Sequence, residues 1–219
     1  MSKPLPKKFF HQDAQILAKQ LIGKVMRSKY HDMWLSAQII ETEAYYLADK
    51  SSHASLGFTE KRSALFMPAG TIYMYYSRAG DSLNISCKGK GNAVLVKSAV
   101  PYFDDNAQMI EMMRQLNPAK NGVRSIDKLC AGQTLLCRAL NLKVKEWDQQ
   151  PFDPKRFFIE DVGYQPNTLI QTTRLGISEG RDEDLPYRFI DYDYVDSCTS
   201  NPLRKKKEVF WTLIPASDL

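Results

Sequence analysis

A pattern of period two between Met33 and Tyr45 constrains the fold of this chain more than any other feature. Successive side chains of a β-strand point to opposite faces, so the odd-numbered positions of this segment share one face. That face begins with the apolar residues Met33, Leu35, Ala37 and Ile39 and continues with Glu41, Glu43 and Tyr45. The segment therefore predicts a long strand whose apolar face ends in two carboxylates and a tyrosine.

The rest of the chain alternates between helical and strand patterns, without an internal repeat or a low-complexity linker. Apolar residues at helical spacing predict helices over 14–22, 109–116 and 133–140, and Asp13 is the expected N-cap of the first. Strands are expected over 71–76, 83–87, 92–97, 156–160, 172–177 and 208–214, with a polar loop over 51–63. We therefore expect a single α+β domain over residues 1–219, in which 1–8 and 191–207 are flexible.

Charge and cysteine content narrow the classes of function. The 30 Lys and Arg residues exceed the 25 Asp and Glu residues and give a net charge of +5, which favours a polyanionic partner. The four cysteines and three histidines lack the spacing of a zinc site, so no metal or other cofactor is expected. Neither a signal peptide nor a membrane-spanning stretch of about 20 apolar residues is found, which predicts a reduced cytoplasmic protein with no membrane partner. Cys130 and Cys137 are accordingly expected in the core.

Glu41 and Glu43 are the first candidates for chemistry. Two residues apart on a strand, they point the same way with backbones about 6.5–7 Å apart. Burial on an apolar face raises the pKa of a carboxyl towards the range useful for proton transfer. Two other interpretations stay open: an edge strand that ends in solvent with two ordinary glutamates, or paired carboxylates that hydrolyse a sugar glycoside.

Aromatic residues cluster around the same segment. Tyr45 shares a face with Glu43, Tyr73 and Tyr75 share a face of the next expected strand, and His53 lies in the intervening loop. Aromatic rings beside a carboxylate suit a flat ligand such as a nucleobase. Tyrosine is also simply a good strand former, so the pattern alone does not decide.

Basic residues form a third group. Lys88, Lys90 and Lys97 flank the expected hairpin, and residues 204–207 form a run of four basic side chains. The glycines at 89 and 91 permit close approach of a phosphate backbone but serve a hairpin turn equally well. The run 204–207 fits a solvated loop or a targeting-like patch as well as a contact with nucleic acid.

The segment Ile40–Tyr45, with sequence IETEAY, resembles the alkyladenine (3-methyladenine) DNA glycosylase family. Further segments resemble that family in the same order along residues 9–203: 9–10 with the helix that follows, 65–75, 83–86, 89–96, 129–132 with 136–140, 174–177 and 186–189. The resemblance implies a single domain built around a curved antiparallel β-sheet with peripheral helices. It also implies a cofactor-free monomer that acts on double-stranded DNA. Such an enzyme flips alkylated or deaminated purines out of the helix and excises them hydrolytically, leaving an abasic site; the substrate class comprises 3-methyladenine, 7-methylguanine, hypoxanthine and ethenoadenine.

The resemblance also implies a role for individual residues. Glu43 matches the catalytic glutamate that deprotonates the attacking water, and Glu41 is not assigned this role. Tyr45 and Tyr75 match the aromatics that stack on the flipped base. His53 matches the pocket histidine, and Asn84 matches the asparagine that sterically excludes purine amino groups. Family members are monofunctional because water, and not a lysine amine, attacks the sugar.

Two departures from the family pattern concern the contact with DNA. The family fills the gap left by the flipped base with a tyrosine followed by Gly-Met, which the stretch 76–82 lacks; we predict Arg78 as the filling residue, with Tyr76 as the next candidate. The family arginine at the end of the central strand is Lys97 here, which still neutralises phosphate but loses bidentate geometry. Lys88, Lys90 and Lys97 are therefore predicted DNA contacts. These departures keep open a non-catalytic family member that only binds damaged DNA.

Overall fold

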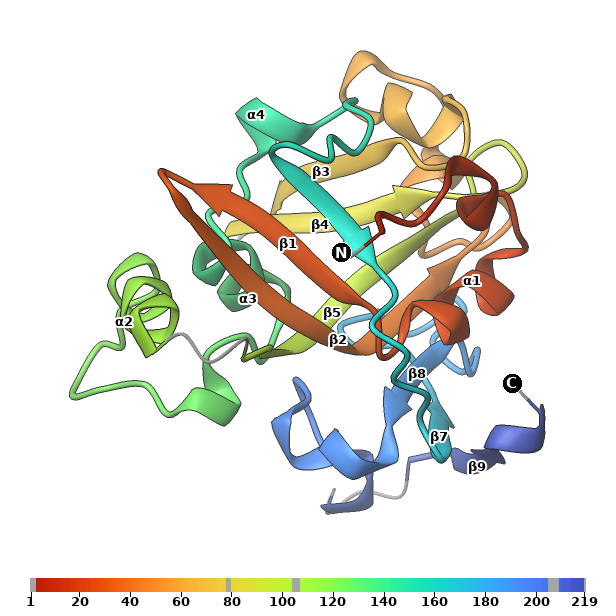
Figure 1. Cartoon of the computed structure of the whole chain (residues 1–219). Coiled ribbons are helices and arrows are strands. Elements are labelled where there is room, and N and C mark those ends of the chain that lie inside the picture. Colours follow the sequence, from red (N-terminus) through yellow and green to blue (C-terminus); the bar gives the residue numbers. More distant parts are fainter. Residues whose placement is uncertain (1–2, 78–79, 104–106, 205–208, 219) are drawn as a thin grey trace.

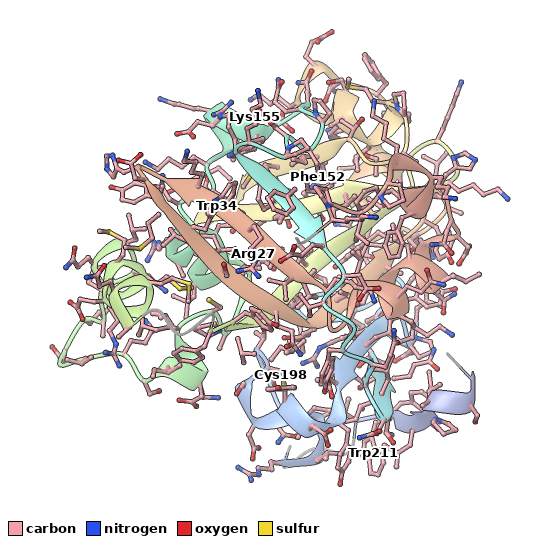
Figure 2. All side chains as sticks on the ribbon, viewed as in Figure 1. Arg27, Trp34, Phe152, Lys155, Cys198 and Trp211 are labelled. Atoms are coloured by element: carbon pink, nitrogen blue, oxygen red, sulfur yellow. The ribbon has the colours of Figure 1, made fainter. Side chains whose placement is uncertain are left out.

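The computed structural model describes residues 3–77, 80–103, 107–204 and 209–218. Within them, nine strands form one open antiparallel sheet: β1 (Val25–Tyr30), β2 (Met33–Tyr45), β3 (Ile72–Ser77), β4 (Gly80–Ser86), β5 (Ala93–Pro101), β6 (Phe157–Glu160), β7 (Thr168–Thr172), β8 (Arg188–Asp191) and β9 (Trp211–Pro215). The order is β3-β4-β5-β2-β8-β7-β9, and β1 pairs with β2 and β6. In Figures 1 and 2, β3 lies near the top and β9, marked by Trp211, near the bottom.

Helices lie around this sheet, so the expected α+β fold is confirmed (Figure 1). The α-helices are α1 (Ala14–Leu21), α2 (Ala107–Leu116), α3 (Gln133–Ala139) and α4 (Val144–Trp147). Short 3-10 helices are η1 (Lys7–Phe10), η2 (His53–Leu56), η3 (Glu60–Phe66), η4 (Ile126–Lys128), η5 (Tyr192–Ser197), η6 (Pro202–Arg204) and η7 (Ala216–Asp218).

Strand β2 is the central strand of the sheet. It pairs with β5 on one side, and on the other with β1 along its first part and β8 along its last. Residues 35–44 are all buried, so both faces of the strand are covered. Glu41 and Glu43 are therefore interior residues with no exposed surface, which rules out the edge strand in solvent.

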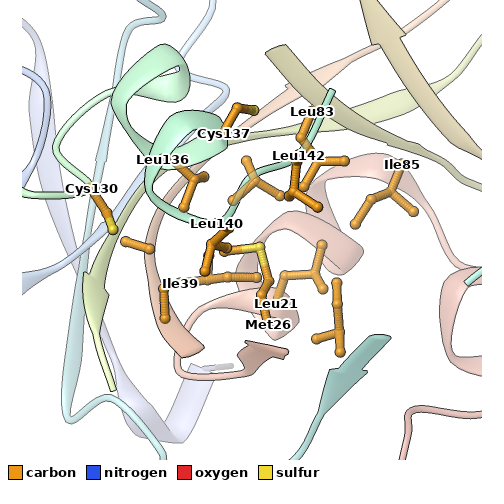
Figure 3. Packing of buried hydrophobic residues seen from close by; sticks show 14 of the residues in the cluster. Leu21, Met26, Ile39, Leu83, Ile85, Cys130, Leu136, Cys137, Leu140 and Leu142 are labelled. Atoms are coloured by element: carbon orange, nitrogen blue, oxygen red, sulfur yellow. The ribbon is translucent and has the colours of Figure 1, made fainter. Parts of the chain in front are cut away.

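The main core lies between the sheet and helices α1 and α3. Figure 3 shows Leu21 of α1 and Ile39 of β2 packed near Leu83 of β4 and Leu136 of α3. Cys130 and Cys137 lie in this core as predicted, and the four cysteines of the chain are buried and unpaired. Apolar burial of this extent explains why the fold needs no disulfide.

The sequence patterns did not predict strands β1 and β8, because the charged residues of these strands look like surface positions. Arg27 of β1 is mostly buried through an ion pair with Glu160, with 2.5 Å between Nε and Oε1. Arg188 of β8 is 1% exposed and pairs with Glu41. Ion pairs between distant segments allow charged residues to be buried, and local patterns do not reveal them.

Two other expectations were wrong. The strand expected over 172–177 ends at Thr172, because the next residues leave the sheet and the Leu175 N–H donates to Glu43 instead of to a neighbouring strand. The polar loop expected over 51–63 contains η2 and the first part of η3. Helices of 3-10 type are short and lack the 3.6-residue periodicity on which sequence patterns depend.

The two segments expected to be flexible contain regular structure where they are described. Pro4 forms a β-bridge with Glu160, and η5 and η6 lie within 192–204. Residues 1–2 and 205–207 lie outside the described part of the chain, so their flexibility stays a prediction. None of the helices in the described part is long and apolar enough to cross a membrane.

The N-cap of α1 provides a test of how the first helix is held. The Asp13 carboxylate accepts from the backbone N–H of Gln15 at 2.9 Å and of Ile16 at 3.4 Å, and from the Tyr46 hydroxyl at 2.8 Å. Asp13→Ala should therefore lower the free energy of unfolding by about 1–2 kcal/mol in urea denaturation. Asp32→Ala, at an exposed position in the β1–β2 turn, should change it by less than about 0.5 kcal/mol. An equal effect at both positions would contradict the capping role.

Candidate active site

A cavity of about 400 Å³ lies at the C-terminal end of β2. Its walls include the four residues predicted to form the base pocket: Tyr45 of β2, His53 of η2, Tyr75 of β3 and Asn84 of β4. The loop after β7 contributes residues 175–178. The volume lies within the range of about 300–1,000 Å³ that is usual for small-molecule sites. Segments far apart in the sequence thus converge on one pocket of suitable size for a nucleobase.

The aromatic rings of the pocket are held by contacts with neighbouring side chains. The Arg174 guanidinium lies over the Tyr45 ring, 4.6 Å from its centroid. The Tyr75 ring meets the His53 ring edge-on, with centroids 4.5 Å apart, and His53 Nδ1 lies 2.8 Å from the Tyr73 hydroxyl. Rings held in this way present a preorganised surface to a planar ligand.

Glu43 is a buried carboxylate with three donors. Its Oε1 accepts from the Leu175 N–H at 3.0 Å and lies 3.4 Å from Lys97 Nζ, and its Oε2 accepts from the Tyr45 hydroxyl at 2.8 Å. Burial alone would raise the pKa of Glu43, but Lys97, the Leu175 N–H, Arg188 and Tyr45 together outweigh it and lower this pKa below its ordinary value of 4.5. Glu43 is therefore ionised at neutral pH beside the cavity.

The Tyr45 hydroxyl, which donates to Glu43, keeps its own proton. Burial and the adjacent Glu43 charge raise the pKa of the Tyr45 hydroxyl well above its ordinary value. The hydroxyl therefore remains a donor to Glu43 across the physiological pH range. The arrangement suits a carboxylate that accepts a proton from water or faces a developing positive charge.

Glu41 has a different environment from Glu43. Its carboxylate accepts from Arg188 Nε at 2.6 Å, from the Ser98 hydroxyl at 2.5 Å and from the Thr199 N–H at 2.8 Å. Glu41 is not part of the cavity wall, whereas Glu43 contacts three residues that are. The strand spacing did not distinguish the two carboxylates, but their contacts do. Because only one of them is next to the cavity, the structure disfavours the sugar-glycosidase interpretation, which requires a pair.

Lys97 is a residue of the cavity wall. Its side chain is only 10% exposed, lines the cavity and pairs with Glu43. The structure therefore identifies Lys97 as a partner of Glu43 in the cavity wall, and its contact with a DNA phosphate stays a prediction.

The other predicted DNA contacts fall into two groups. Lys88 and Lys90 are exposed in the turn between β4 and β5, as a phosphate contact requires. Arg78 lies outside the described residues, and Tyr76, two residues before it, is 74% exposed on β3.

Gly91, in the same turn as Lys88 and Lys90, has φ +80°, and a Cβ there would lie 2.9 Å from side-chain atoms of Ala54 and Leu47. The packing of the turn therefore requires glycine at this position, independently of any contact with a DNA backbone.

His53 is held neutral near the pocket entrance. Burial and the nearby Arg62 and Arg181 lower the pKa of its imidazole below the ordinary 6.5. A neutral ring beside Tyr73 is suited to hydrogen bonding or packing against a base. Among the described residues, no group of three or more His, Cys, Asp or Glu side chains is arranged to hold a metal ion.

The sequence did not reveal Arg174, Leu175, Arg188 or Gln133 as parts of the site. Arg174 and Leu175 fell in a segment expected to be a strand, and the contacts of Arg188 and Gln133 depend on long-range pairing. The available signals were that 174–177 and 186–189 belong to segments that resemble the family, which include Arg174, Leu175 and Arg188 but not Gln133.

The charge of Lys97 provides a direct test of the electrostatics at Glu43. Lys97→Met keeps the length of the side chain and removes its charge, the largest of the causes that lower the pKa of Glu43, so this pKa should rise. The pH titration of the Glu43 carboxyl carbon, followed by NMR, should therefore have its midpoint at higher pH than in the wild type. Lys88→Met, which removes an exposed charge, should leave the midpoint unchanged. An unshifted midpoint in Lys97→Met would contradict the assigned ion pair.

Comparisons with known proteins identify the family. The sequence model of methylpurine-DNA glycosylases matches residues 8–194, which include all the cavity residues described above. A protein of Pseudomonas savastanoi pv. phaseolicola is 58% identical over 208 residues, which cover 94% of this chain and 93% of its own. A Pseudomonas aeruginosa protein is 57% identical over 207 residues (93% and 87%), and a Francisella tularensis protein 32% over 186 (81% and 90%). All three carry the provisional name 3-methyladenine DNA glycosylase. The resemblance found in the sequence is thus confirmed: the chain belongs to the methylpurine-DNA glycosylase family, a family of DNA glycosylases.

Proposed function

We propose that this protein is a monofunctional glycosylase of base excision repair that removes 3-methyladenine and related purines from double-stranded DNA. The related purines are 7-methylguanine, hypoxanthine and ethenoadenine. The observation that carries this proposal is a buried, ionised Glu43 next to a cavity lined by Tyr45 and Tyr75. A similar role is given by the names of the bacterial relatives. We expect the protein to act as a monomer on chromosomal DNA in the cytoplasm.

Only a base that has left the DNA helix can enter the cavity. A purine inside a stacked duplex cannot reach a pocket enclosed by η2, β3 and the loop after β7, so the nucleotide must rotate out of the helix. Stacking on Tyr45 and Tyr75 then offsets part of the unstacking energy. Asn84 lies in the wall with its amide donating to the Tyr73 carbonyl at 3.2 Å, which fixes it as a steric limit for amino groups on the purine.

Hydrolysis then needs one water and one base. In the proposed reaction, water attacks the anomeric carbon, Glu43 takes a proton of the water, and the bond from that carbon to the purine breaks with its electron pair leaving on the purine. A cationic alkylated purine departs as a neutral base, and an uncharged purine departs with the proton that the water has released. As the sugar becomes cation-like, the negative charge of Glu43 stabilises it. Lys97 and the Leu175 N–H hold the Glu43 carboxylate in place, and the carboxylate stays unprotonated and able to accept a proton.

The alternative of a non-catalytic DNA-binding protein is supported only by the absence of the family tyrosine that fills the gap left by the flipped base. We predict Arg78 in that role, with the exposed Tyr76 as second candidate. The set of contacts around Glu43 argues against a loss of excision. A protein that only binds DNA does not need a desolvated, ionised carboxylate, whose burial is costly.

The role of Glu43 is testable by single-turnover excision. Glu43→Gln keeps the size of the side chain and removes the base, so excision of hypoxanthine from a duplex should fall about 10²–10⁴-fold. Binding to the damaged duplex should be nearly unchanged. Glu60→Gln, on η3, is the matched control and should keep the wild-type rate. Full activity of Glu43→Gln would refute the proposed mechanism.

The predicted phosphate contacts are testable through salt dependence. Each true contact contributes about 0.9 to the slope of log affinity against log salt concentration. Lys88→Ala and Lys90→Ala should therefore each reduce the slope by about one unit. Lys155→Ala, at an exposed site that is not among the predicted contacts, is the control. Unchanged slopes in both variants would place the β4–β5 turn away from the DNA.

A further inference from the structure

Arg174 contacts the pocket residue Tyr45 but does not itself line the cavity. It lies just after β7, and only 4% of it is exposed. Its guanidinium carbon is 4.6 Å from the centroid of the Tyr45 ring. A cation within about 6 Å of a ring centroid interacts with the π-electrons of that ring. Arg174 is therefore a buried cation that is separated from the cavity by an aromatic ring.

Hydrogen bonds to three residues hold the guanidinium over this ring. Its Nη1 donates to Asp49 Oδ2 at 2.8 Å and to the Ala44 carbonyl at 3.1 Å, and its Nη2 donates to the Asp182 carbonyl at 3.3 Å. A guanidinium does not lose its proton in proteins. The positive charge beside the Tyr45 ring is therefore permanent and fixed in place.

We propose that Arg174 is a positioning residue that acts through the Tyr45 ring, and that its charge shifts the binding preference of the pocket from cationic towards uncharged purines. This inference rests on the proposed glycosylase function. It adds to that function a preference within the class of substrates.

The Tyr45 ring has two faces, and the guanidinium of Arg174 occupies one of them. A purine that stacks on Tyr45 therefore takes the other face, with the ring between it and the cation. A ring that already binds a cation on one face attracts a second cation less, and the two like charges repel each other across the ring. An uncharged purine experiences no such repulsion.

The chemistry of the purines gives this difference a consequence for excision. In DNA, 7-methylguanine carries a positive charge and leaves readily, so weaker stacking does not prevent its excision. Hypoxanthine and ethenoadenine are uncharged and leave less readily, so their excision depends more on being held in the reactive orientation. A pocket that favours uncharged purines in stacking therefore supports the substrates that need it most.

Asp49 partly offsets the charge of Arg174. Its carboxylate is buried, and its Oδ2 accepts from the Tyr46 N–H at 2.9 Å as well as from Arg174. Asp49→Asn keeps an oxygen acceptor and removes the negative charge, so the charge of Arg174 then acts on the pocket with less compensation. Removing the cation and removing the anion should therefore change the purine preference in opposite directions. A merely structural role predicts no such opposition, because either change breaks the same ion pair.

The test measures how tightly the Glu43→Gln protein, which does not consume the substrate, binds duplexes that contain 7-methylguanine or hypoxanthine. In this background, Arg174→Met should raise the affinity for 7-methylguanine relative to hypoxanthine about 2- to 10-fold. Asp49→Asn should lower this ratio, and Arg174→Lys, which keeps the charge, should leave it close to that of the parent. Arg156→Met is the matched control, because its guanidinium lies 4.7 Å from the Trp147 ring, away from the cavity. An unchanged ratio in Arg174→Met, or a shift of the same sign in Asp49→Asn, would overturn the proposal.

A double variant guards against a loss of folding, because Arg174→Met leaves the Asp49 carboxylate buried without its cation. Arg174→Met combined with Asp49→Asn removes both charges, and thermal unfolding shows whether each variant is folded. The double variant should still raise the ratio, by less than Arg174→Met alone. An unchanged ratio in the folded double variant would equally overturn the proposal.

Excision assays separate this inference from the proposed function. If the wild type excises neither purine, the proposed function fails, whereas the binding ratio still decides the role of Arg174. If the wild type excises both purines and the ratio does not respond to the charge at residue 174, the inference alone fails. If the Glu43→Gln protein binds neither damaged duplex more tightly than an undamaged one, no purine stacks on Tyr45 and the inference fails as well.

Discussion

Two ionisable carboxylates are buried in the central strand β2, and the surrounding structure is organised to keep them there. Burying a charge is costly unless cations and hydrogen-bond donors compensate it. The compensation comes from other elements: Arg188 of β8 and Ser98 of β5 for Glu41, and Lys97 of β5 and the Leu175 N–H of the loop after β7 for Glu43. Satisfying the two charges therefore aligns both neighbouring strands with β2 and brings the loop that closes the cavity against Glu43.

This requirement also separates the two glutamates chemically. The donors of Glu41 include a bonded guanidinium, a hydroxyl and a backbone N–H, and they leave it behind the cavity wall. Glu43 pairs with an ammonium and with a tyrosine that itself lines the cavity. Glu41 thus connects β2 with its neighbours away from the cavity, whereas Glu43 contacts residues of the cavity wall, which is why we propose Glu43 as the base.

Much of this arrangement was predictable from sequence, because it depends on local periodicity. The bounds of β2, the start of α1 at Asp13 and the buried cysteines follow from patterns within single segments. The family resemblance identified Tyr45, His53, Tyr75 and Asn84, which the structure places in one cavity. The buried Arg188, the location of Lys97 and the contact from Leu175 were not predictable, because each depends on the pairing of distant segments. Charged residues in a local pattern look solvent-exposed, and only the tertiary structure shows that their partners are buried with them.

The central claim is that a flipped purine lies between Tyr45 and Tyr75 with its sugar next to Glu43. The most direct measurement is a crystal structure of the Glu43→Gln variant bound to a duplex that contains ethenoadenine. The account predicts density for the purine between the two rings and places the anomeric carbon on the side of residue 43. An ethenoadenine that remains stacked in the helix, or a flipped nucleotide whose anomeric carbon faces another group, would contradict it.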